Sequence, residues 1–318
     1  MARHRGLGQL GGRVTRDDDT GRGDGPGLGR PRCPACGSSR LARLGAPRVI
    51  ETDIVVSRAT GICRCSVCDL LFFVPVESSE SVLGQYAVLS GDSWTGYARP
   101  DWDLARSAIL RRIPMGSVLD VGCWTGEFVS SLPDSFATHG VEPSDWARAQ
   151  AAKNGVSVLG ASLADVAEQG VTFDAITIID VLEHATAPLE ELSAARRLLS
   201  PKGVIIIATG NSRCLAWRMM PRDYWYYFAE HKCFFSKRWF QWAANEIELR
   251  LEEARSYAHF PGAFWGPGAD LAKACAFRAF GGPRSHAYRA LVRTRLVPPR
   301  PTTRRSRDHI IVVLGPRR

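Results

Sequence analysis

The sequence predicts an α/β fold in which a mostly parallel sheet follows a small cysteine-bearing module. From Met115 onward, short apolar segments alternate with helical ones, which is typical of parallel strands joined by helices. Ahead of this region, two C-x-x-C pairs are separated by residues 37–64, a pattern typical of a small metal-held module. A chain of 318 residues is long enough for one α/β domain and such a module.

Composition places the chain among ordinary globular proteins, with 45% hydrophobic and 23% charged residues. No apolar run reaches the roughly 18–20 residues needed to span a bilayer. The basic first residues are not followed by the apolar segment of a secretory signal, so we expect a cytoplasmic location. The net charge of +9 is concentrated in residues 284–318, which hold ten Arg and one Asp. Such a segment can attract phosphates, nucleic acid or an anionic membrane surface, or can simply be a solvated face.

Composition shifts divide the chain into four segments. Residues 1–31 are rich in Gly, Arg and Asp and are predicted to be a disordered tail. Residues 32–78 carry the paired cysteines, and residues 79–100 form a linker. The α/β domain covers residues 101–318. Two parts of it are expected to cap the substrate site, residues 211–242 and 258–307.

The elements of the α/β domain follow from patterning. A helix is predicted over 101–113, because its apolar residues recur at helical spacing. Predicted strands cover 117–122, 137–142, 156–160, 173–180 and 203–210. Predicted helices cover 126–132, 144–155, 163–170 and 188–199, with Ser144 as an N-cap and Gly155 as a stop. In such a sheet, a ligand is expected at the carboxyl ends of the strands.

The four paired cysteines are predicted to hold a structural zinc ion. Each C-x-x-C pair closes a knuckle that presents two sulfurs, and two knuckles complete a tetrahedral site with no open position. The ligands would be Cys33, Cys36, Cys65 and Cys68. Gly37 suits the turn after the first knuckle, and Asp69 stands at the matching place after the second. Cys63 is an alternative ligand, and four free or redox-active cysteines are the alternative interpretation.

A second candidate site follows the strand 117–122, which runs into a turn containing Gly122 and Gly126 at a helix N-terminus. Backbone N–H groups and the helix dipole there suit an anionic ligand group. Glu142 closes the next strand at the spacing expected of a ribose-binding acid. Trp124 and Glu127 stand where a dinucleotide fingerprint requires glycine, and no P-loop lysine follows. The turn therefore argues against a nicotinamide dehydrogenase.

Four segments in order resemble successive motifs of the class I S-adenosylmethionine (SAM)-dependent methyltransferases. They read VLDVGCWTGEF, GVEPS, FDAITIIDVLEHATAP and LLSPKGVIIIATGN. The resemblance covers residues 100–257 and resumes at DHIIVVLG, which is similar to the family's last, antiparallel strand. It is strongest for the group that includes ubiquinone-biosynthesis O-methyltransferases and enzymes of surface-polysaccharide and natural-product clusters, where an N-terminal zinc ribbon also occurs. The resemblance implies a Rossmann-like sheet and SAM as cofactor.

The resemblance also implies roles for individual residues. Asp120 and the backbone from Gly122 to Gly126 would hold the methionine moiety, and Glu142 would bind the ribose diol. Asp180 with Val181 would line the methionine and sulfonium side, and Ser162 with Leu163 would meet adenine. The implied cofactor set is Asp120, Gly122, Cys123, Trp124, Gly126, Glu142, Ser162, Leu163, Asp180 and Val181.

Three residues are candidates for the chemistry at the acceptor, namely Glu183, His184 and His231. An alcohol or phenol acceptor benefits from a base or a metal ion that favours its deprotonated form. We favour His184 or His231 as the base. In a second interpretation, Asp180 joins these three in holding a divalent cation, as in some O-methyltransferases with an E-x-x-E-H…H arrangement. In a third, the LEH segment only caps the strand and helix through hydrogen bonds.

Aromatic residues give two further predictions. Trp124 is expected to have a negative φ and to point away from the cofactor, towards the linker aromatics Tyr86, Trp94 and Tyr97. Residues 217–242 contain eleven aromatic residues, which suggests an apolar lid, a stacking platform or the core of a helical cap. In the second cap segment, residues 270–280 are predicted to form an amphipathic helix.

The resemblance and the residues together predict methyl transfer from SAM to a hydroxyl of a small molecule or glycan precursor. The setting would be surface-polysaccharide or natural-product biosynthesis. The alternatives are a nucleotide-sugar C-methyltransferase, an RNA methyltransferase that uses the ribbon and the Arg-rich segment, and a non-catalytic zinc-ribbon scaffold. Nucleic acid is not the expected partner, because the basic residues cluster in one segment. The basic C-terminus can make peripheral contact with a membrane.

Overall fold

The structure, a computed structural model, describes residues 31–51, 57–87, 89, 91, 99–259, 266–280, 285–293 and 307–317. Residues 31–318 belong to one compact unit. The predicted tail up to residue 30, the linker residues Trp94 and Tyr97, and residues 294–306 of the Arg-rich segment lie outside the described residues.

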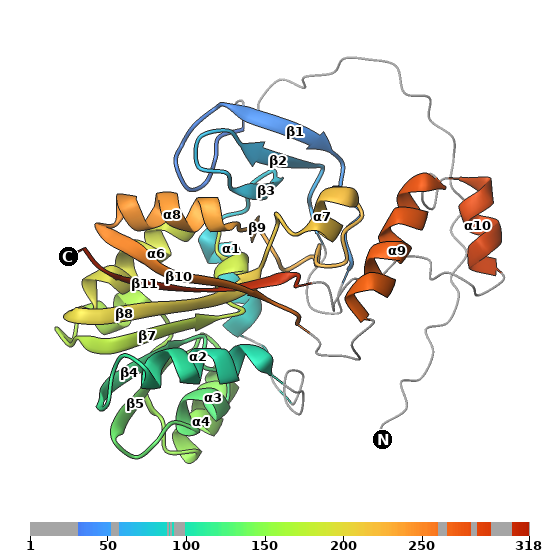
Figure 1. The fold of residues 1–318 in the computed structure, drawn as a ribbon. Helices are drawn as coiled ribbons and strands as arrows, with labels where there is room; N and C mark the ends of the chain where they lie inside the picture. Colours follow the sequence, from blue (N-terminus) through green and yellow to red (C-terminus); the bar gives the residue numbers. More distant parts are fainter. Residues whose placement is uncertain are drawn as a thin grey trace. The chain divides into compact units, whose positions relative to one another are not determined.

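A seven-stranded sheet carries the domain, with strand order β10-β11-β8-β7-β4-β5-β6 (Figure 1). Its parallel strands are β4 (Gly116–Val121), β5 (Phe136–Val141), β6 (Ser157–Gly160), β7 (Phe173–Ile179) and β8 (Leu199–Gly210). Strand β11 (His309–Pro316) pairs antiparallel with β8, and β10 (Leu249–Tyr257) pairs antiparallel with β11. The predicted mostly parallel sheet with an antiparallel last strand is confirmed.

Helices cover both faces of this sheet, with α2 below it and α8 above it in Figure 1. One face packs against α2 (Pro100–Leu110), α3 (Glu127–Ser130) and α4 (Asp145–Lys153). The other packs against α5 (Leu163–Ala167), α6 (Pro188–Arg197) and α8 (Lys237–Glu246). Successive residues of a strand point to opposite faces, so Ile206 of β8 joins the first core while Ile205 and Ile207 join the second.

The predicted elements agree with the structure within a few residues. Strand β8 begins at Leu199, four residues earlier than expected. The Ser144 hydroxyl accepts the N–H of Ala147 and caps α4 as predicted, and Gly155 follows the helix with a φ of +82°. Strand β10 and helix α8 were not predicted. Among the described residues, every helix is too short or too polar to span a bilayer.

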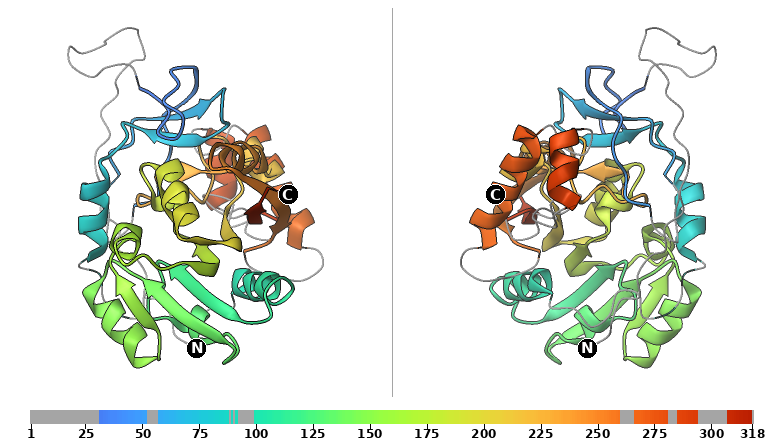
Figure 2. Two further views of the ribbon diagram at one scale, coloured as in Figure 1. Left: turned by 90° about the vertical axis from the view of Figure 1, so that its left-hand side faces the viewer. Right: turned by 90° about the vertical axis from the view of Figure 1, so that its right-hand side faces the viewer.

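The cysteine module is a small antiparallel sheet that residues from the cap segment extend. Its own strands are β1 (Leu41–Gly45), β2 (Gly61–Cys65) and β3 (Leu71–Val74). Strand β9 (Cys233–Phe234) pairs with β3 and adds a fourth strand. Figures 1 and 2 show this sheet beside the helices that cover the seven-stranded sheet rather than at the end of a free linker. The linker begins with helix α1 (Ser79–Ala87).

The aromatic residues between 217 and 234 form a third core, whereas Phe235, Trp239 and Phe240 join the core under α8. Trp217 of α7 (Leu215–Met219) stacks on Tyr224, with ring centroids 4.4 Å apart, and packs edge-on against Tyr227 and Phe234. Phe73 of β3 joins the same cluster. Core packing therefore accounts for most of these aromatics, as in the third predicted alternative. The predicted helix at 270–280 lies within α9 (Gly266–Ala279), and α10 (His286–Arg293) follows.

Candidate functional site

The turn after β4 requires glycine at two positions. Gly122 has a φ of +70° and Gly126 a φ of +78°, in the left-handed region that favours glycine. A Cβ added to Gly122 would lie 2.5 Å from Cγ2 of Val181, and one added to Gly126 would lie 2.6 Å from Cγ2 of Val156. The turn is therefore packed closely against the strand ends on both sides.

Most N–H groups of this turn donate within the protein. Those of Gly122 and Cys123 donate to the Val141 carbonyl, at 2.7 and 3.1 Å, and that of Gly126 donates to the Cys123 carbonyl at 2.7 Å. The Trp124 N–H donates to Oε2 of Glu142 at 3.0 Å. These four N–H groups therefore already have acceptors within the chain.

Trp124 stands where the dinucleotide fingerprint has a glycine, and it takes a backbone conformation that favours glycine. Its φ is +48°, so the prediction of a negative φ was wrong. The indole packs against Trp146 in the first turn of α4, with centroids 5.6 Å apart. Two of the linker aromatics predicted to lie beside it, Trp94 and Tyr97, are outside the described residues. A left-handed conformation costs a non-glycine residue about 1–2 kcal/mol, which the closed turn imposes.

Glu142 lies at the end of β5 and joins two turns. Its Oε1 accepts the N–H of Ser144 at 2.9 Å, while Oε2 accepts that of Trp124. The side chain is only 5% exposed, and burial raises its pKa although both hydrogen bonds lower it. Each carboxylate oxygen has a second lone pair. Glu142 can therefore accept two further hydroxyl donors, such as those of a ribose diol.

Two aspartates at this edge have raised pKa values. Burial raises the pKa of Asp120 to about 7, although the Thr177 hydroxyl donates to its Oδ1 at 2.6 Å. Asp180 follows β7 with a φ of +52°, and burial raises its pKa to about 7. Arg99 donates to its Oδ2 at 2.9 Å. Its Oδ1 is buried and has no hydrogen-bond partner among the described residues. A cationic ligand group would supply that partner.

The remaining cofactor candidates follow the ends of strands, but their side chains differ in whether they are free to contact a ligand. The Ser162 hydroxyl accepts the N–H of Asp165 and caps α5, and Leu163 is buried in the core. The Cys123 side chain is also buried, close to Gly140. Val181 packs on Gly122. Their side chains are therefore mainly structural, which leaves backbone contacts to a ligand at these positions.

The acceptor candidates lie together. One ligand atom each of Glu183, His184 and His231 lies within 4.8 Å of the others. Glu183 is the middle residue of the short 3-10 helix η1 (Leu182–His184) and is fully buried. Thr209 donates to its Oε2 at 2.8 Å, and the Tyr226 hydroxyl donates to its Oε1. Asp180 is not part of this cluster, which corrects the four-residue cation site.

The two histidines are held by different partners. Nδ1 of His231 donates to the Tyr226 carbonyl at 2.9 Å, so its Nε2 keeps a free lone pair. Burial lowers the pKa of His231 well below its usual range, which keeps the imidazole neutral. His184 packs edge-on against His231, with centroids 4.8 Å apart. Its Nδ1 lies 2.5 Å from the Tyr86 hydroxyl and 3.3 Å from the Glu230 carbonyl.

The four predicted metal ligands of the cysteine module converge. The sulfurs of Cys33, Cys36, Cys65 and Cys68 lie within 4.8 Å of one another, and two pairs are 3.5 Å apart. Gly37 and Asp69, which follow the two knuckles, have nearly equal φ values of +67° and +68°. Cys63 lies outside this cluster. Tetrahedral zinc with Zn–S bonds of about 2.3 Å places sulfurs about 3.8 Å apart, which the cluster fits.

Sequence reasoning missed the contacts between the cysteine module and the acceptor side. Asp69, 3% exposed, accepts hydrogen bonds from the Ser236 hydroxyl at 2.7 Å and from Arg213. The Phe73 N–H donates to the Lys232 carbonyl, and the Lys232 N–H donates to the Glu183 carbonyl at 2.7 Å. Only the position of Asp69 after its knuckle was visible in the sequence.

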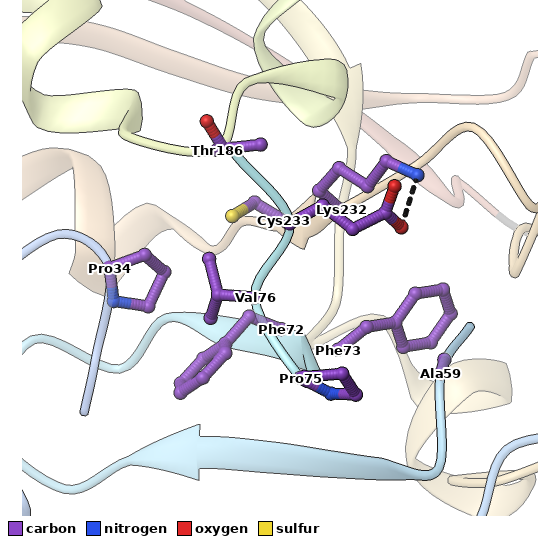
Figure 3. Close-up of a pocket in the computed structure, with 10 residues that line it drawn as sticks. Pro34, Ala59, Phe72, Phe73, Pro75, Val76, Thr186, Lys232 and Cys233 are labelled. Carbon is purple, nitrogen blue, oxygen red and sulfur yellow. Dashed lines mark hydrogen bonds and ion pairs between the residues drawn. The ribbon is translucent and has the colours of Figure 1, made fainter. Parts of the chain in front are cut away.

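A hollow between the cysteine module and the Lys232 segment lies beside these contacts (Figure 3). Pro34, Phe72 and Val76 line one side, and Lys232, which pairs with Glu77 at 2.9 Å, lines the other. Its volume of about 10 Å³ has room for roughly one water molecule. It is a packing defect of the interface and not a substrate pocket.

Comparison with known proteins agrees with this geometry. A family described as methyltransferase domains matches residues 96–254. The ubiquinone biosynthesis O-methyltransferase of Klebsiella pneumoniae is 32% identical over 110 residues, which cover 32% of this chain and 46% of that protein. That of Actinobacillus pleuropneumoniae is 31% identical over 115 residues, covering 32% and 49%. The chain thus spans about half the length of the curated relatives it matches.

Solved methyltransferase structures are similar at lower identity. An N-methyltransferase from Bradyrhizobium japonicum, in complex with S-adenosyl-L-homocysteine, is 12% identical, with a TM-score of 0.43. The match covers 76% of this chain and 100% of that one.

Proposed function

The chain belongs to the methyltransferase-domain family, which matches half of its length, and from this premise we propose that it transfers a methyl group from SAM to a hydroxyl oxygen. The acceptor we propose is a small molecule or glycan precursor. The domain itself is a SAM-dependent methyltransferase domain. Two similar proteins are named as O-methyltransferases, which supports oxygen as the receiving atom.

The observation that carries the proposal is the unpaired Oδ1 of Asp180, which follows β7 and precedes the Glu183 cluster. SAM carries an ammonium and a sulfonium, and Asp120 with Asp180 would hold these cationic groups. Glu142 would accept the ribose hydroxyls through its remaining lone pairs. When bound, SAM supplies an electrophilic methyl group. The chain's contribution is to orient it towards an acceptor at the cluster.

His231 is the group we propose to receive the acceptor proton. Its Nδ1 is committed to the Tyr226 carbonyl, and its neutral Nε2 retains the lone pair that a base needs. The buried Glu183 carboxyl accepts hydrogen bonds from Thr209 and Tyr226 and would hold these side chains in place beside the site. A hydroxyl placed between this cluster and Asp180 would lose its proton as the methyl group approaches.

The same cluster supports a second role for these residues. Two imidazoles and one carboxylate within 4.8 Å are a donor set that suits a divalent cation. The low pKa of His231 keeps it in the neutral form that binds metal and makes it a weaker base. A bound cation would supply a lower pKa for the acceptor hydroxyl. Activity that survives chelation supports the base, and activity restored only by Mg²⁺ or Mn²⁺ supports the cation.

For the cysteine module, we propose a structural zinc ion held by Cys33, Cys36, Cys65 and Cys68. Four converging sulfurs leave no open coordination position, so the ion would hold the module together without taking part in chemistry. Elemental analysis of the purified protein should find about one zinc per chain. Absence of zinc would contradict the assignment.

The proposed function is tested first by SAM binding. Glu142→Ala removes a charged acceptor of two hydroxyls, each worth about 1.5–3 kcal/mol, so the Kd for SAM should rise by about 100-fold or more. Glu127→Ala changes an exposed carboxylate in the adjoining helix and should leave the Kd unchanged. Calorimetry measures both. Unchanged affinity in Glu142→Ala contradicts the role of this residue.

The acceptor class is tested next, by methyl transfer to 3,4-dihydroxybenzoate, a simple aromatic diol. Product with a methylated oxygen supports the hydroxyl proposal. Transfer to a nucleotide sugar at carbon would support the alternative C-methyltransferase. RNA binding that weakens steeply with salt would support an RNA methyltransferase.

A further inference from the structure

We propose that Tyr86, in the linker helix α1, donates its hydroxyl proton to Nδ1 of His184 and thereby fixes the tautomer and orientation of that imidazole in the acceptor site. The inference rests on the proposed function for the role of the site, but not for the contact itself. Tyr86 lies outside residues 96–254, so nothing in the family match assigns it a role.

The contact between the two side chains is close and well oriented. The Tyr86 oxygen lies 2.5 Å from Nδ1 of His184, and the rings meet edge-on with centroids 5.3 Å apart. The end of the linker helix is held in place from a second direction, because the Ser144 hydroxyl donates to the Leu89 carbonyl at 2.7 Å. The linker thus touches both the His184 side and the Glu142 side of the carboxyl edge.

The direction of the hydrogen bond follows from the available acceptors. A phenol is protonated at neutral pH, so the Tyr86 hydroxyl must place its proton on a partner. His184 is its only hydrogen-bond partner among the described residues. The Glu230 carbonyl, 3.3 Å from the same nitrogen, can accept but cannot donate. With Tyr86 as donor, Nδ1 is an acceptor and Nε2 carries the hydrogen.

The two histidines would then have different roles, one as a proton acceptor and the other as a hydrogen-bond donor. His231 presents an unprotonated Nε2, whereas His184 presents an N–H that can donate to the acceptor oxygen. Loss of the phenol would leave the Glu230 carbonyl as the remaining partner of Nδ1 among the described residues. That partner favours the opposite tautomer, with hydrogen on Nδ1 and a lone pair on Nε2. Tyr86 is therefore a positioning residue, and removing its hydroxyl should exchange the two nitrogens' roles.

The first test uses no substrate. Long-range ¹H–¹⁵N spectra of the full chain with ¹⁵N-labelled histidine report which ring nitrogen of His184 carries hydrogen, and His184→Gln identifies its signals. In the wild type we expect Nε2–H; in Tyr86→Phe we expect Nδ1–H or a mixture. The matched control is Tyr227→Phe, which removes a buried hydroxyl that bonds Trp217 and Pro221 instead. It should leave the His184 signals unchanged.

The second test measures turnover of 3,4-dihydroxybenzoate. Tyr86→Phe should lower kcat about tenfold while the Kd for SAM stays within about twofold, and Tyr227→Phe should keep kcat. An Nδ1–H tautomer in the wild type, or unchanged His184 signals in Tyr86→Phe, would overturn the inference. A wild type that binds no SAM would overturn the proposed function instead, while the spectra would still decide the role of Tyr86.

Discussion

The cofactor side and the acceptor side of the carboxyl edge are built in different ways. On the cofactor side, Glu142 is held by the N–H groups of Trp124 and Ser144, its neighbours within 18 positions. On the acceptor side, His184 contacts Tyr86 from 98 positions away, and Ser236 contacts Asp69 from 167 positions away. The Glu142 carboxylate is thus held by residues close in sequence, whereas the acceptor side depends mainly on contacts with the N-terminal third of the chain.

The two sides also differ in the segments against which they pack. Local turns on β4 and β5 shape the cofactor side, and they lie inside the matched residues 96–254. The segment that carries His231 instead pairs through β9 with β3 of the cysteine module. A change in the module can therefore alter the acceptor side without disturbing the SAM side.

The largest effect is expected from opening the cysteine cluster. Cys33→Ser should release about one zinc per chain and lower methyl transfer more than about 100-fold, because the His231 segment loses the strand it pairs with. The Kd for SAM should change less than about threefold. Elemental analysis, turnover and calorimetry measure the three quantities.

Cys275→Ser is the matched control for this substitution, because Cys275 is an exposed thiol on α9 far from the cluster in sequence. It should keep both zinc and activity. Equal losses of SAM binding and turnover in Cys33→Ser would show that the two sides are not separable.

A smaller effect is expected at Asp69, which links the second knuckle to Ser236 and Arg213. Asp69→Ala leaves a partly exposed arginine without its partner and puts alanine at a φ of +68°, so we expect a loss of about 2–3 kcal/mol. That corresponds to a fall in Tm of roughly 6 °C. Asp69→Asn tolerates the left-handed backbone and should lose about half as much. An identical Tm in both variants would exclude the backbone contribution.

The cofactor side was largely predictable because its residues are close in sequence. The strand before Gly122, the spacing to Glu142 and the cap at Ser144 are local signals, and each element formed as expected. The sign of φ at Trp124 was not predictable. A tryptophan normally avoids the left-handed region, and only the closed turn forces it there.

The acceptor side was predictable in its residue types but not in its partners. Glu183, His184 and His231 were expected together, and the structure brings them together. Asp180 was placed with them because of the resemblance to an E-x-x-E-H…H arrangement, yet its carboxylate pairs with Arg99 and lies outside the cluster. Neither Arg99 nor Tyr86 could be assigned, because their positions depend on how the linker packs, and packing between distant segments leaves no periodic signal.

The pH dependence of SAM binding tests the cofactor side alone. The folded pKa values of Asp120 and Asp180 are raised to about 7, so the ligand-free protein loses stability as pH rises from about 4 to 7. A cationic ligand favours the ionised carboxylates. SAM should therefore bind more tightly as pH rises towards 7.5, by up to about tenfold per unit for each group.

Above about pH 8 the ligand's own amino group loses its proton, so the affinity should level off or fall. Asp120→Asn should release about one proton fewer on binding, so the affinity should rise less steeply with pH. Calorimetry in buffers of different ionisation enthalpy would count the protons released. A flat profile between pH 5.5 and 7.5 would show that neither aspartate ionises on binding.

The smallest effect is expected at Trp124, the residue that replaces a glycine in the turn. Trp124→Gly relieves about 1 kcal/mol of left-handed strain and loses the contact with Trp146, worth about 0.5–1.5 kcal/mol. These terms offset one another, and a glycine N–H can still donate to Glu142. Stability should change by less than about 1 kcal/mol and the Kd for SAM by less than about threefold. SAM binding more than tenfold tighter would show that the indole occupies space the cofactor needs, and the cofactor side would then be the specialised one.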